Sequence, residues 1–322
     1  MLSLSVIICS HNPRPDYFQR CLAGLKDQSL PREQWELMLI DNASDRPLSE
    51  SWDLGWHANG AIVTEPSLGL SIARRHGMRA ARAELLVFVD DDVVLAPDYL
   101  ARVLEIAQSR PRLALWGSGH IEGEFEIPLP EKYKKYQSLL SVRIFDEDKI
   151  AVQYPAPDAT PWGGGMCVRT SICRQHLVRN RTDRLPLTGR KGKELAAGED
   201  EELSLLAFDN GMQVGTFTAL KITHLIPRTR ICEDYLLRAA EGAKYGMCII
   251  QYKIKGRLPH YPFSLGGAVH FIRSLLRSRG FDRRMHLASL RGALRARRAI
   301  AAGRTGAPRQ DQSPDNAGRS GI

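Results

Sequence analysis

The sequence predicts an α/β protein with a mainly parallel central sheet flanked by helices and a basic helical extension at its C-terminus. In the N-terminal third, short apolar runs alternate with segments whose apolar residues recur at helical spacing. Strands that alternate with helices are typical of βαβ units and therefore of a parallel sheet. Polar clusters follow the first, second and fourth runs, which places them together at the edge where parallel strands end.

Four strands and three helices are expected in this first part. The strands are residues 3–9, 35–40, 61–63 and 85–89, short apolar runs bounded by polar or charged residues. The helices are residues 17–28, 70–83 and 97–109. In the first helix Phe18, Cys21, Leu22 and Leu25 fall on one face, and Pro97 marks the start of the third.

The rest of the chain is less regular. We expect a strand at 113–118, a loop with a short helix at 122–150, a glycine-rich turn entering a strand at 162–168, a basic flexible segment at 182–197, a helix from 198 to about 210, a strand at 213–224 and a helix at 232–250. A basic amphipathic helix and a tail of disordered composition follow. The predicted units are a main domain at residues 1–255, a helical extension at 256–303 and a disordered tail at 304–322.

Composition favours a globular protein of the cytoplasm. Hydrophobic residues make up 43% and charged residues 25%, and no apolar run is long enough to span a bilayer. We expect residues 1–8 to form a strand and not a signal peptide, because they lack a basic leader and a small-residue cleavage site. The six cysteines show no C-x-x-C spacing, which argues against a structural zinc site and for reduced thiols.

Much of the excess positive charge lies near the C-terminus, in a chain whose net charge is +9. Between Arg273 and Arg304 there are many arginines and one acidic residue, Asp282. Apolar residues also gather near one helical face, namely Phe263, Leu265, Val269, Ile272, Leu275 and Leu276. This pattern predicts an anionic partner, either a membrane surface or a polyanion. A membrane partner would place the protein on the inner face of the membrane. Packing on the main domain and a solvated basic face are the alternatives.

Three adjacent carboxylates follow the fourth predicted strand. Leu85–Val89 runs directly into Asp90, Asp91 and Asp92. Clustered carboxylates repel one another unless a cation or proton relieves them, and a hard divalent metal that carries a substrate diphosphate would do so. The alternative is a solvated acidic loop. No G-x-G-x-x-G follows the first strand and no G-x-x-x-x-G-K-[ST] occurs, which argues against an ordinary dinucleotide fold and a P-loop.

An ordered set of short motifs resembles a known enzyme family. The motifs are SVIICSHN at 5–12, DNAS at 41–44, GLSIAR at 69–74, VDDD at 89–92, GED at 198–200 and His224. Each is weak alone, but their order resembles family 2 glycosyltransferases with the nucleotide-diphospho-sugar transferase fold of GT-A type, over roughly residues 3–250. The resemblance implies that residues 1–255 form a catalytic domain, which moves a sugar from a nucleotide diphosphate sugar with inversion at the anomeric carbon.

The resemblance assigns the acidic run to a D-x-D signature that holds Mg²⁺ or Mn²⁺. It implies that Asp92 is a direct metal ligand and that Asp90 contacts the donor ribose or the metal. Asp91 is expected to point away, because neighbouring residues of a strand alternate. His224 matches a histidine that ligates the metal or touches the diphosphate, although a lone histidine is more often structural. A bound divalent cation would stabilise the negative charge of the leaving diphosphate.

The donor nucleotide is assigned to the ends of the first two strands. The resemblance implies that Asp41 accepts a hydrogen bond from the nucleobase and that Ser10 and Asn12 line the same pocket. Asp41 and Asn12 are equally compatible with ordinary turns. Arg74 matches an arginine near the diphosphate, but Arg75 stands where the family often has asparagine, and a surface arginine is the alternative.

The acceptor side is assigned to two later segments. The resemblance implies that Asp200, at a helix start that favours an ionised carboxylate, is the general base that takes the acceptor hydroxyl proton. Glu199 would hydrogen-bond the acceptor. Trp162 could stack on a sugar, and Gly164, in a glycine run, lets backbone approach it closely. An ordinary acidic first turn and a plain tight turn are the alternatives.

These features predict a glycosyltransferase with a glycan or a lipid-linked carrier as acceptor, as in cell-envelope polysaccharide synthesis. No nucleic-acid partner is expected. A nucleotidyltransferase acting on sugar phosphates is an alternative, but such enzymes usually place a glycine-rich basic loop after the first strand, where this chain has SHNPRP. A non-catalytic membrane- or polyanion-binding protein is the third reading. The intact acidic cluster speaks against it, because adjacent like charges are costly to keep.

Overall fold

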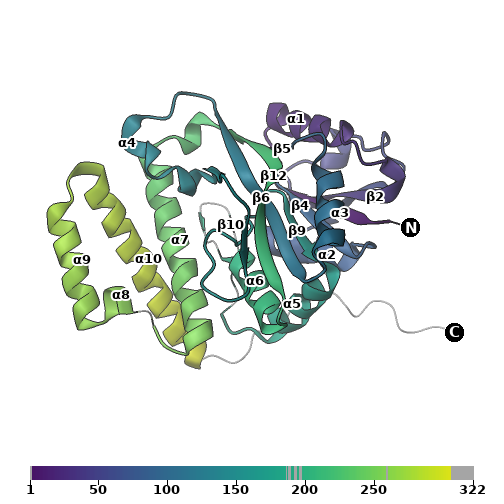
Figure 1. The fold of residues 1–322 in the computed structure, drawn as a ribbon. Helices are drawn as coiled ribbons and strands as arrows, with labels where there is room; N and C mark the ends of the chain where they lie inside the picture. Colours follow the sequence, from purple (N-terminus) through teal and green to yellow (C-terminus); the bar gives the residue numbers. More distant parts are fainter. Residues whose placement is uncertain are drawn as a thin grey trace.

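The structure is a computed structural model that describes residues 2–185, 187, 190–191, 194–195, 198–258 and 260–305. It is a mixed α/β fold whose curved central sheet has the strand order β3-β2-β1-β4-β9-β6-β12-β5 (Figure 1). The α/β class predicted from the sequence is confirmed.

The N-terminal half of the sheet is parallel, as predicted. Its strands are β1 (Leu4–Ser10), β2 (Trp35–Asn42), β3 (Gly60–Glu65) and β4 (Leu85–Val89), and β1 pairs with both β2 and β4. Of the first three helices, α1 (Pro15–Lys26) lies between β1 and β2 and α2 (Leu70–Ala80) between β3 and β4, while α3 (Tyr99–Ser109) follows the last of these strands. Since these strands run in one direction, their carboxyl ends meet at one edge.

The second half of the sheet mixes directions. β9 (Met166–Arg169) runs antiparallel between β4 and β6 (Leu113–Phe125), and β12 (Gln213–Ile226) lies parallel to β6. Three short strands pair antiparallel with these long ones: β5 (Val93–Leu95), β7 (Arg143–Ile144) and β8 (Lys149–Ala151). β6 extends seven residues beyond the predicted strand, and β7 and β8 lie in the segment predicted as loop.

Helices cover both faces of the sheet over two apolar layers. α1 and α3 pack on one face, where Phe18, Trp35 and Trp116 are fully buried. The other face is covered by α2, α5 (Thr170–Thr182) and α6 (Glu199–Asp209). α5 is not predicted from the sequence. The short elements are α4 (Glu131–Lys134), the hairpin β10 (Arg190–Lys191) and β11 (Glu194–Leu195), and the 3₁₀ turns η1 (Arg32–Gln34), η2 (Leu48–Glu50), η3 (Gln137–Leu140) and η4 (Arg228–Arg230).

Four further helices follow within the described residues. α7 (Glu233–Lys255) ends at Gly256, which adopts a left-handed conformation with φ 64°. α8 (His260–Phe263), α9 (Leu265–Arg277) and α10 (Gly280–Thr305) follow; α10 packs along α7, and α9 lies beyond α10 at the outer edge (Figure 1). The predicted amphipathic segment is therefore three helices, and the two long ones, α9 and α10, are separated at Ser278. Most of the predicted tail at 304–322 lies outside the described residues.

Within the described part of the chain, no helix combines the length and the apolar character needed to cross a bilayer.

Candidate functional site

The predicted donor residues lie at the carboxyl ends of the parallel strands. Ser10 ends β1 and is in register with Asp41 near the end of β2, while the acidic run follows β4 on the other side of β1. The hydroxyl of Ser10 donates a hydrogen bond to Asp91 Oδ2. The topology thus brings the polar clusters that follow the first, second and fourth strands to one edge of the sheet, as predicted.

The acidic run is a turn, and this corrects one expectation. The backbone N–H of Val93 donates to the carbonyl of Asp90 at 3.1 Å, so the alternation of a strand does not continue past Val89. Asp91 consequently faces Ser10 and does not point away, and the prediction for it is wrong. Burial, reinforced by the charge of Asp92, raises the pKa of Asp91 to about 7, although the hydrogen bond from Ser10 opposes this shift.

Arg74 draws three carboxylates together from distant parts of the chain. Its Nη2 lies 3.3 Å from Asp90 Oδ1, and its Nη1 lies 3.0 Å from Glu199 Oε2 and 3.4 Å from Asp200 Oδ1. Only 6% of the Arg74 side chain is exposed. Burial alone would lower the pKa of Arg74, but the three carboxylates hold it above its ordinary value. We call Arg74 with Asp90, Glu199 and Asp200 the Arg74 cluster.

The glycine run at 163–165 closes over the Arg74 cluster. A Cβ at Gly163 would overlap Arg74 Nη2, so a larger residue there would displace the guanidinium. The N–H of Gly163 donates to Asp200 Oδ2 at 3.1 Å. A Cβ at Gly164 would lie 3.5 Å from Asp90 Oδ2. The predicted glycine turn therefore lies against the acidic residues because its backbone can approach them.

Glu199 and Asp200 occupy the first turn of α6. Gly198 precedes them with φ 122°, a conformation that side-chain-bearing residues rarely adopt. Burial raises the pKa of Asp200 to about 7, while Arg74 opposes the shift. Glu199 is 4% exposed, and its Oε1 has no hydrogen-bond partner among the described residues. A buried acceptor atom beside Asp200 is suited to a hydroxyl donor.

The guanidinium of a second arginine, Arg230, lies beside Asp92 and His224. Arg230 Nη2 is 2.7 Å from Asp92 Oδ2, and Arg230 Nη1 is 3.1 Å from His224 Nε2. His224 Nε2 is itself 3.6 Å from Asp92 Oδ2. Because arginine only donates, the imidazole accepts through Nε2. We call these three residues the Arg230 cluster; pairing of β12 with β5 aligns His224 with Val93 and so holds it beside Asp92.

Asp92 and His224 are residue types that bind metal ions, but two ligands alone do not make a complete metal site. A carboxylate oxygen and an imidazole nitrogen both aimed at one cation suit Mn²⁺ or Mg²⁺ in part, and a bound diphosphate would supply further oxygens. His224 Nδ1 is buried without a partner in the described structure. No group of three His, Cys, Asp or Glu residues converges on a metal position anywhere in that part of the chain.

Asn12 and Asp41 organise the loops beside Ser10. Asp41 is buried, and its two carboxylate oxygens accept the backbone N–H groups of Ser44 and Leu48 at 3.1 and 2.9 Å. Asn12, in a left-handed conformation with φ 49°, exchanges two hydrogen bonds with Asp45. Asn12 is thus a turn residue, whereas Asp41 belongs to β2 and fixes the turn that follows it; their predicted contacts with the nucleotide remain predictions.

Trp162 rests on a buried arginine. The Arg143 guanidinium lies 4.1 Å from the Trp162 ring centre and donates to the carbonyls of Ser118 and Thr160. Burial lowers the pKa of Arg143 to about 10, while the charge of Asp200 opposes the shift. Trp162 thus keeps a fixed plane near the Arg74 cluster, as stacking on a sugar would require.

The sequence reasoning missed three residues of this site. Arg230 and Arg143 follow no motif, although arginine is the expected partner of buried carboxylates and aromatic faces. Asn42, next to Asp41, accepts the N–H of Gly69 at 2.8 Å and so fixes the start of α2, four residues before Arg74. Its place in the DNAS motif could have been a signal.

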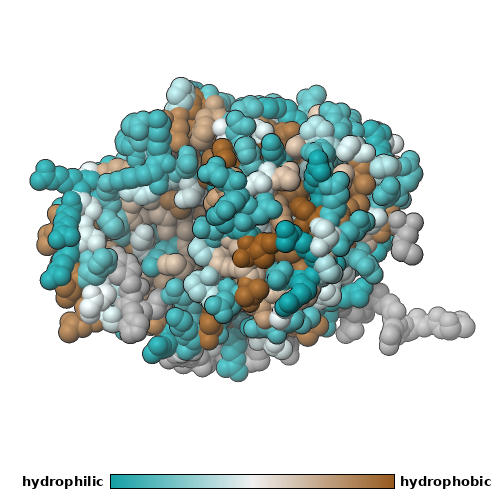
Figure 2. Space-filling model, viewed as in Figure 1, coloured by the Kyte–Doolittle hydropathy of each residue, from teal (hydrophilic) through white to brown (hydrophobic). Residues whose placement is uncertain are grey.

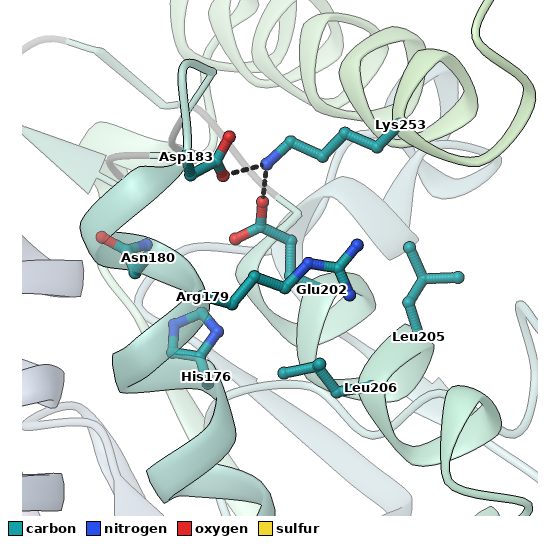
Figure 3. A pocket seen from close by; sticks show the side chains of 8 residues that line it. All are labelled: His176, Arg179, Asn180, Asp183, Glu202, Leu205, Leu206 and Lys253. Atoms are coloured by element: carbon teal, nitrogen blue, oxygen red, sulfur yellow. Dashed lines mark hydrogen bonds and ion pairs between the residues drawn. The ribbon is translucent and has the colours of Figure 1, made fainter. Parts of the chain in front are cut away.

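A pocket lies between α5, α6 and α7, and none of the predicted site residues lines it (Figure 3). It is lined by His176, Arg179, Asn180, Asp183, Glu202, Leu205, Leu206 and Lys253. In it, Lys253 of α7 pairs with Glu202 of α6 and, at 2.5 Å, with Asp183. This ion pair ties the helix that carries Asp200 to α7.

Comparisons with known proteins agree with the fold. The model of the family described as glycosyl transferase family 2 matches residues 5–169, about half of the chain. The fold and this match define the class of the protein as a glycosyltransferase with a fold of GT-A type. The chain belongs to glycosyl transferase family 2.

Similar proteins cover different parts of the chain. The protein named "Putative glycosyltransferase EpsH" of Bacillus subtilis (strain 168) is 24% identical over 115 residues, which are 35% of this chain and 33% of that protein. TarS (residues 1–349) of S. aureus superposes over 95% of this chain and 92% of its own, at 13% identity and a TM-score of 0.52. The mannosyltransferase PcManGT of Pyrobaculum calidifontis superposes over 94% and 76%, at 16% identity and a TM-score of 0.56. These two structures bear on the fold alone.

Proposed function

We propose that the protein is a metal-dependent, inverting glycosyltransferase that moves a sugar from a nucleotide diphosphate sugar to a hydroxyl of a glycan or a lipid-linked acceptor. The observation that carries the proposal is the convergence of carboxylates from two distant segments, Asp90 and Glu199–Asp200, on Arg74. It supports a site in which a donor and an acceptor meet beside one acidic group poised as a base.

The donor's diphosphate is assigned to the side of Asp92. Asp92 and His224 would hold the divalent cation, Mg²⁺ or Mn²⁺, which when bound neutralises charge on the leaving diphosphate. Arg230 already places a positive charge at this point, and its guanidinium can donate to phosphate oxygens. Ser10, Asn12 and Asp41 would line the nucleotide, with Asp90 close to the ribose.

The sugar is transferred in one displacement. The acceptor hydroxyl oxygen forms a bond to the anomeric carbon as the bond from that carbon to the diphosphate oxygen breaks. The hydroxyl proton passes to Asp200, and the electron pair of the broken bond leaves with the nucleoside diphosphate. Attack opposite the leaving group inverts the anomeric centre. Glu199 Oε1, buried without a partner among the described residues, would accept a second acceptor hydroxyl.

Two structural neighbours suggest which donors to test. TarS has been crystallised with UDP and with UDP-GlcNAc, and PcManGT with GDP-Man and Mn²⁺. A planar Trp162 beside the acidic cluster supports a sugar as acceptor. A cytoplasmic location suits a donor of this class and remains a prediction.

A donor panel tests the proposal. The full chain is incubated with UDP- and GDP-sugars, with Mg²⁺, Mn²⁺ or EDTA, and release of nucleoside diphosphate is measured. We expect turnover of one donor that EDTA abolishes and that added divalent metal restores. Formation of pyrophosphate from a sugar phosphate and a nucleoside triphosphate would instead identify a nucleotidyltransferase. Absence of both donor turnover and donor binding would reject the proposal.

A further inference from the structure

The two long C-terminal helices use their apolar residues differently. α10 buries Met285 and Ala288 against α7 near Leu236, and further along it buries Ala296 against Ile249. On α9 the buried large apolar residue is Phe271. α10 is therefore part of the folded core, whereas most of the apolar surface of α9 is not.

Four apolar residues of α9 form one exposed strip. Leu265 is 85% exposed, Val269 41%, Ile272 53% and Leu276 74%. Their separations of four, three and four residues place them on one face of the helix. Figure 2 shows hydrophobic residues along the outer edge of the molecule where Figure 1 places α9. Scattered exposed leucines are ordinary, but a continuous strip at helical spacing indicates a binding surface.

The charge around this strip is positive and not compensated by the protein. The segment from 257 to 281 contains no Asp or Glu. Among the described residues, no Asp or Glu forms an ion pair with Arg273, Arg277 or Arg279. On α10, by contrast, Arg284 pairs with Glu233 and Arg291 pairs with Glu241. Arg273 and Arg277 of α9, and Arg279 just after it, are thus available to an external anion.

We infer that α9 binds flat on an anionic lipid bilayer, with Leu265, Val269, Ile272 and Leu276 inserted among the lipids and the arginines at the headgroups. An exposed apolar face beside unpaired basic residues is the pattern of an interfacial helix. α9 lies on the far side of α10 from the sheet, so a membrane can approach it without displacing the core (Figure 1). A second copy of the chain fits less well, because it would bring like charges together.

The inference narrows the predicted membrane-binding segment to α9, and it does not depend on sugar transfer. The sequence assigns residues 261–300 to one amphipathic segment, whereas the structure gives membrane binding to α9 and core packing to α10. Vesicle binding needs neither donor nor metal. A protein that binds vesicles without turnover would therefore uphold this inference while the proposed function fails.

Vesicle sedimentation with the full chain tests the apolar strip. The vesicles are phosphatidylcholine, alone or with about one quarter phosphatidylglycerol. We expect wild-type protein to sediment with the anionic vesicles only. Ile272→Gln combined with Leu276→Gln should weaken binding about tenfold or more. The matched control is Leu287→Gln with Leu294→Gln, which changes two leucines of α10 that are 37% and 38% exposed and should leave binding unchanged.

A second pair of variants tests the arginines. Arg273→Gln with Arg277→Gln should weaken binding several-fold, and the loss should be mimicked by high salt. Arg283→Gln with Arg298→Gln, on exposed positions of α10, is the control. Circular dichroism of each variant excludes unfolding. The inference is overturned if wild-type protein ignores anionic vesicles, or if both α9 variants bind them like wild type. Dissociation of a dimer in solution by the α9 variants would instead identify a second copy of the chain as the partner.

Discussion

Two arginines hold the acidic residues of this protein, in different ways. Arg74 is 6% exposed and joins three carboxylates from the end of β4 and the start of α6. Arg230 is 22% exposed, lies on the short turn η4 and contacts one carboxylate and one imidazole. Arg74 is buried among the residues that it joins, whereas Arg230 is partly exposed to solvent.

The difference separates a permanent cation from a replaceable one. Removing Arg74 would strand several buried charges, which is costly. Removing Arg230 would leave Asp92 and His224 facing a partly open position, where another cation can take its place. We therefore expect the Arg74 cluster to set stability and acid–base chemistry, and the Arg230 cluster to set the affinity for metal and diphosphate.

The largest effect is expected for Asp200→Asn, which removes the proposed base and keeps the shape. The kcat for sugar transfer should fall by about 10²- to 10⁴-fold, because asparagine cannot take the hydroxyl proton. Donor affinity, measured by calorimetry with UDP or GDP and metal, should stay within about twofold.

Asp209→Asn is the control, since Asp209 ends the same helix and pairs on the surface with Arg179. A kcat for Asp200→Asn close to that of Asp209→Asn would remove Asp200 from the mechanism.

Arg74→Met should give the largest loss of stability. It leaves Asp90, Glu199 and Asp200 without their shared partner, at a cost of about 3–5 kcal/mol in the free energy of unfolding measured with urea. Arg75→Met changes the neighbouring, more exposed arginine and should cost less than about 1 kcal/mol. Equal losses for the two variants would show that the Arg74 cluster is not what holds α6 against β4.

The pH dependence of kcat/KM reports the state of Asp200 in the free enzyme. Burial raises the pKa of Asp200 to about 7, so the carboxylate that acts as base is protonated below that pH. Activity should therefore fall as pH decreases through about 7. Because Arg74 favours the charged carboxylate, Arg74→Lys should keep the midpoint near 7 and Arg74→Met should move it upward. A profile flat from about pH 5 to 8 would contradict this assignment.

The first half of the fold could be predicted because its signals are local. Leu85–Val89 is a fully buried apolar run, and its boundaries match those of β4. The second half of β6 could not, since Glu122, Gly123 and Glu124 interrupt the apolar run with charge and glycine, which are typical of a loop. The division of the C-terminal segment also escaped prediction, because α9 and α10 share one composition and differ in what each packs against.

Prediction of the site from sequence is limited in the same way, because only local signals could be used. Ordered motifs place Asp90, Asp200 and His224 near one another, because each follows or precedes a recognisable element. Contacts made across the chain carry no such signal: the salt bridge between Arg74 and Glu199 spans 125 residues. Asp91 was misjudged because the alternation of a strand was extended into a turn.

The smallest effect, and the sharpest test of the contrast, is expected for Arg230→Gln. If Arg230 occupies the position that a metal would take, its loss should raise the affinity of the donor-free protein for Mn²⁺ several-fold, as measured by calorimetry. Stability should change by about 1 kcal/mol or less, because Arg230 is partly exposed and its ion pair is screened by solvent. Arg228→Gln, an exposed arginine of the same turn, is the control. Weaker Mn²⁺ binding with a loss of stability as large as that of Arg74→Met would mean that both arginines are structural, and the distinction between the two clusters would fall.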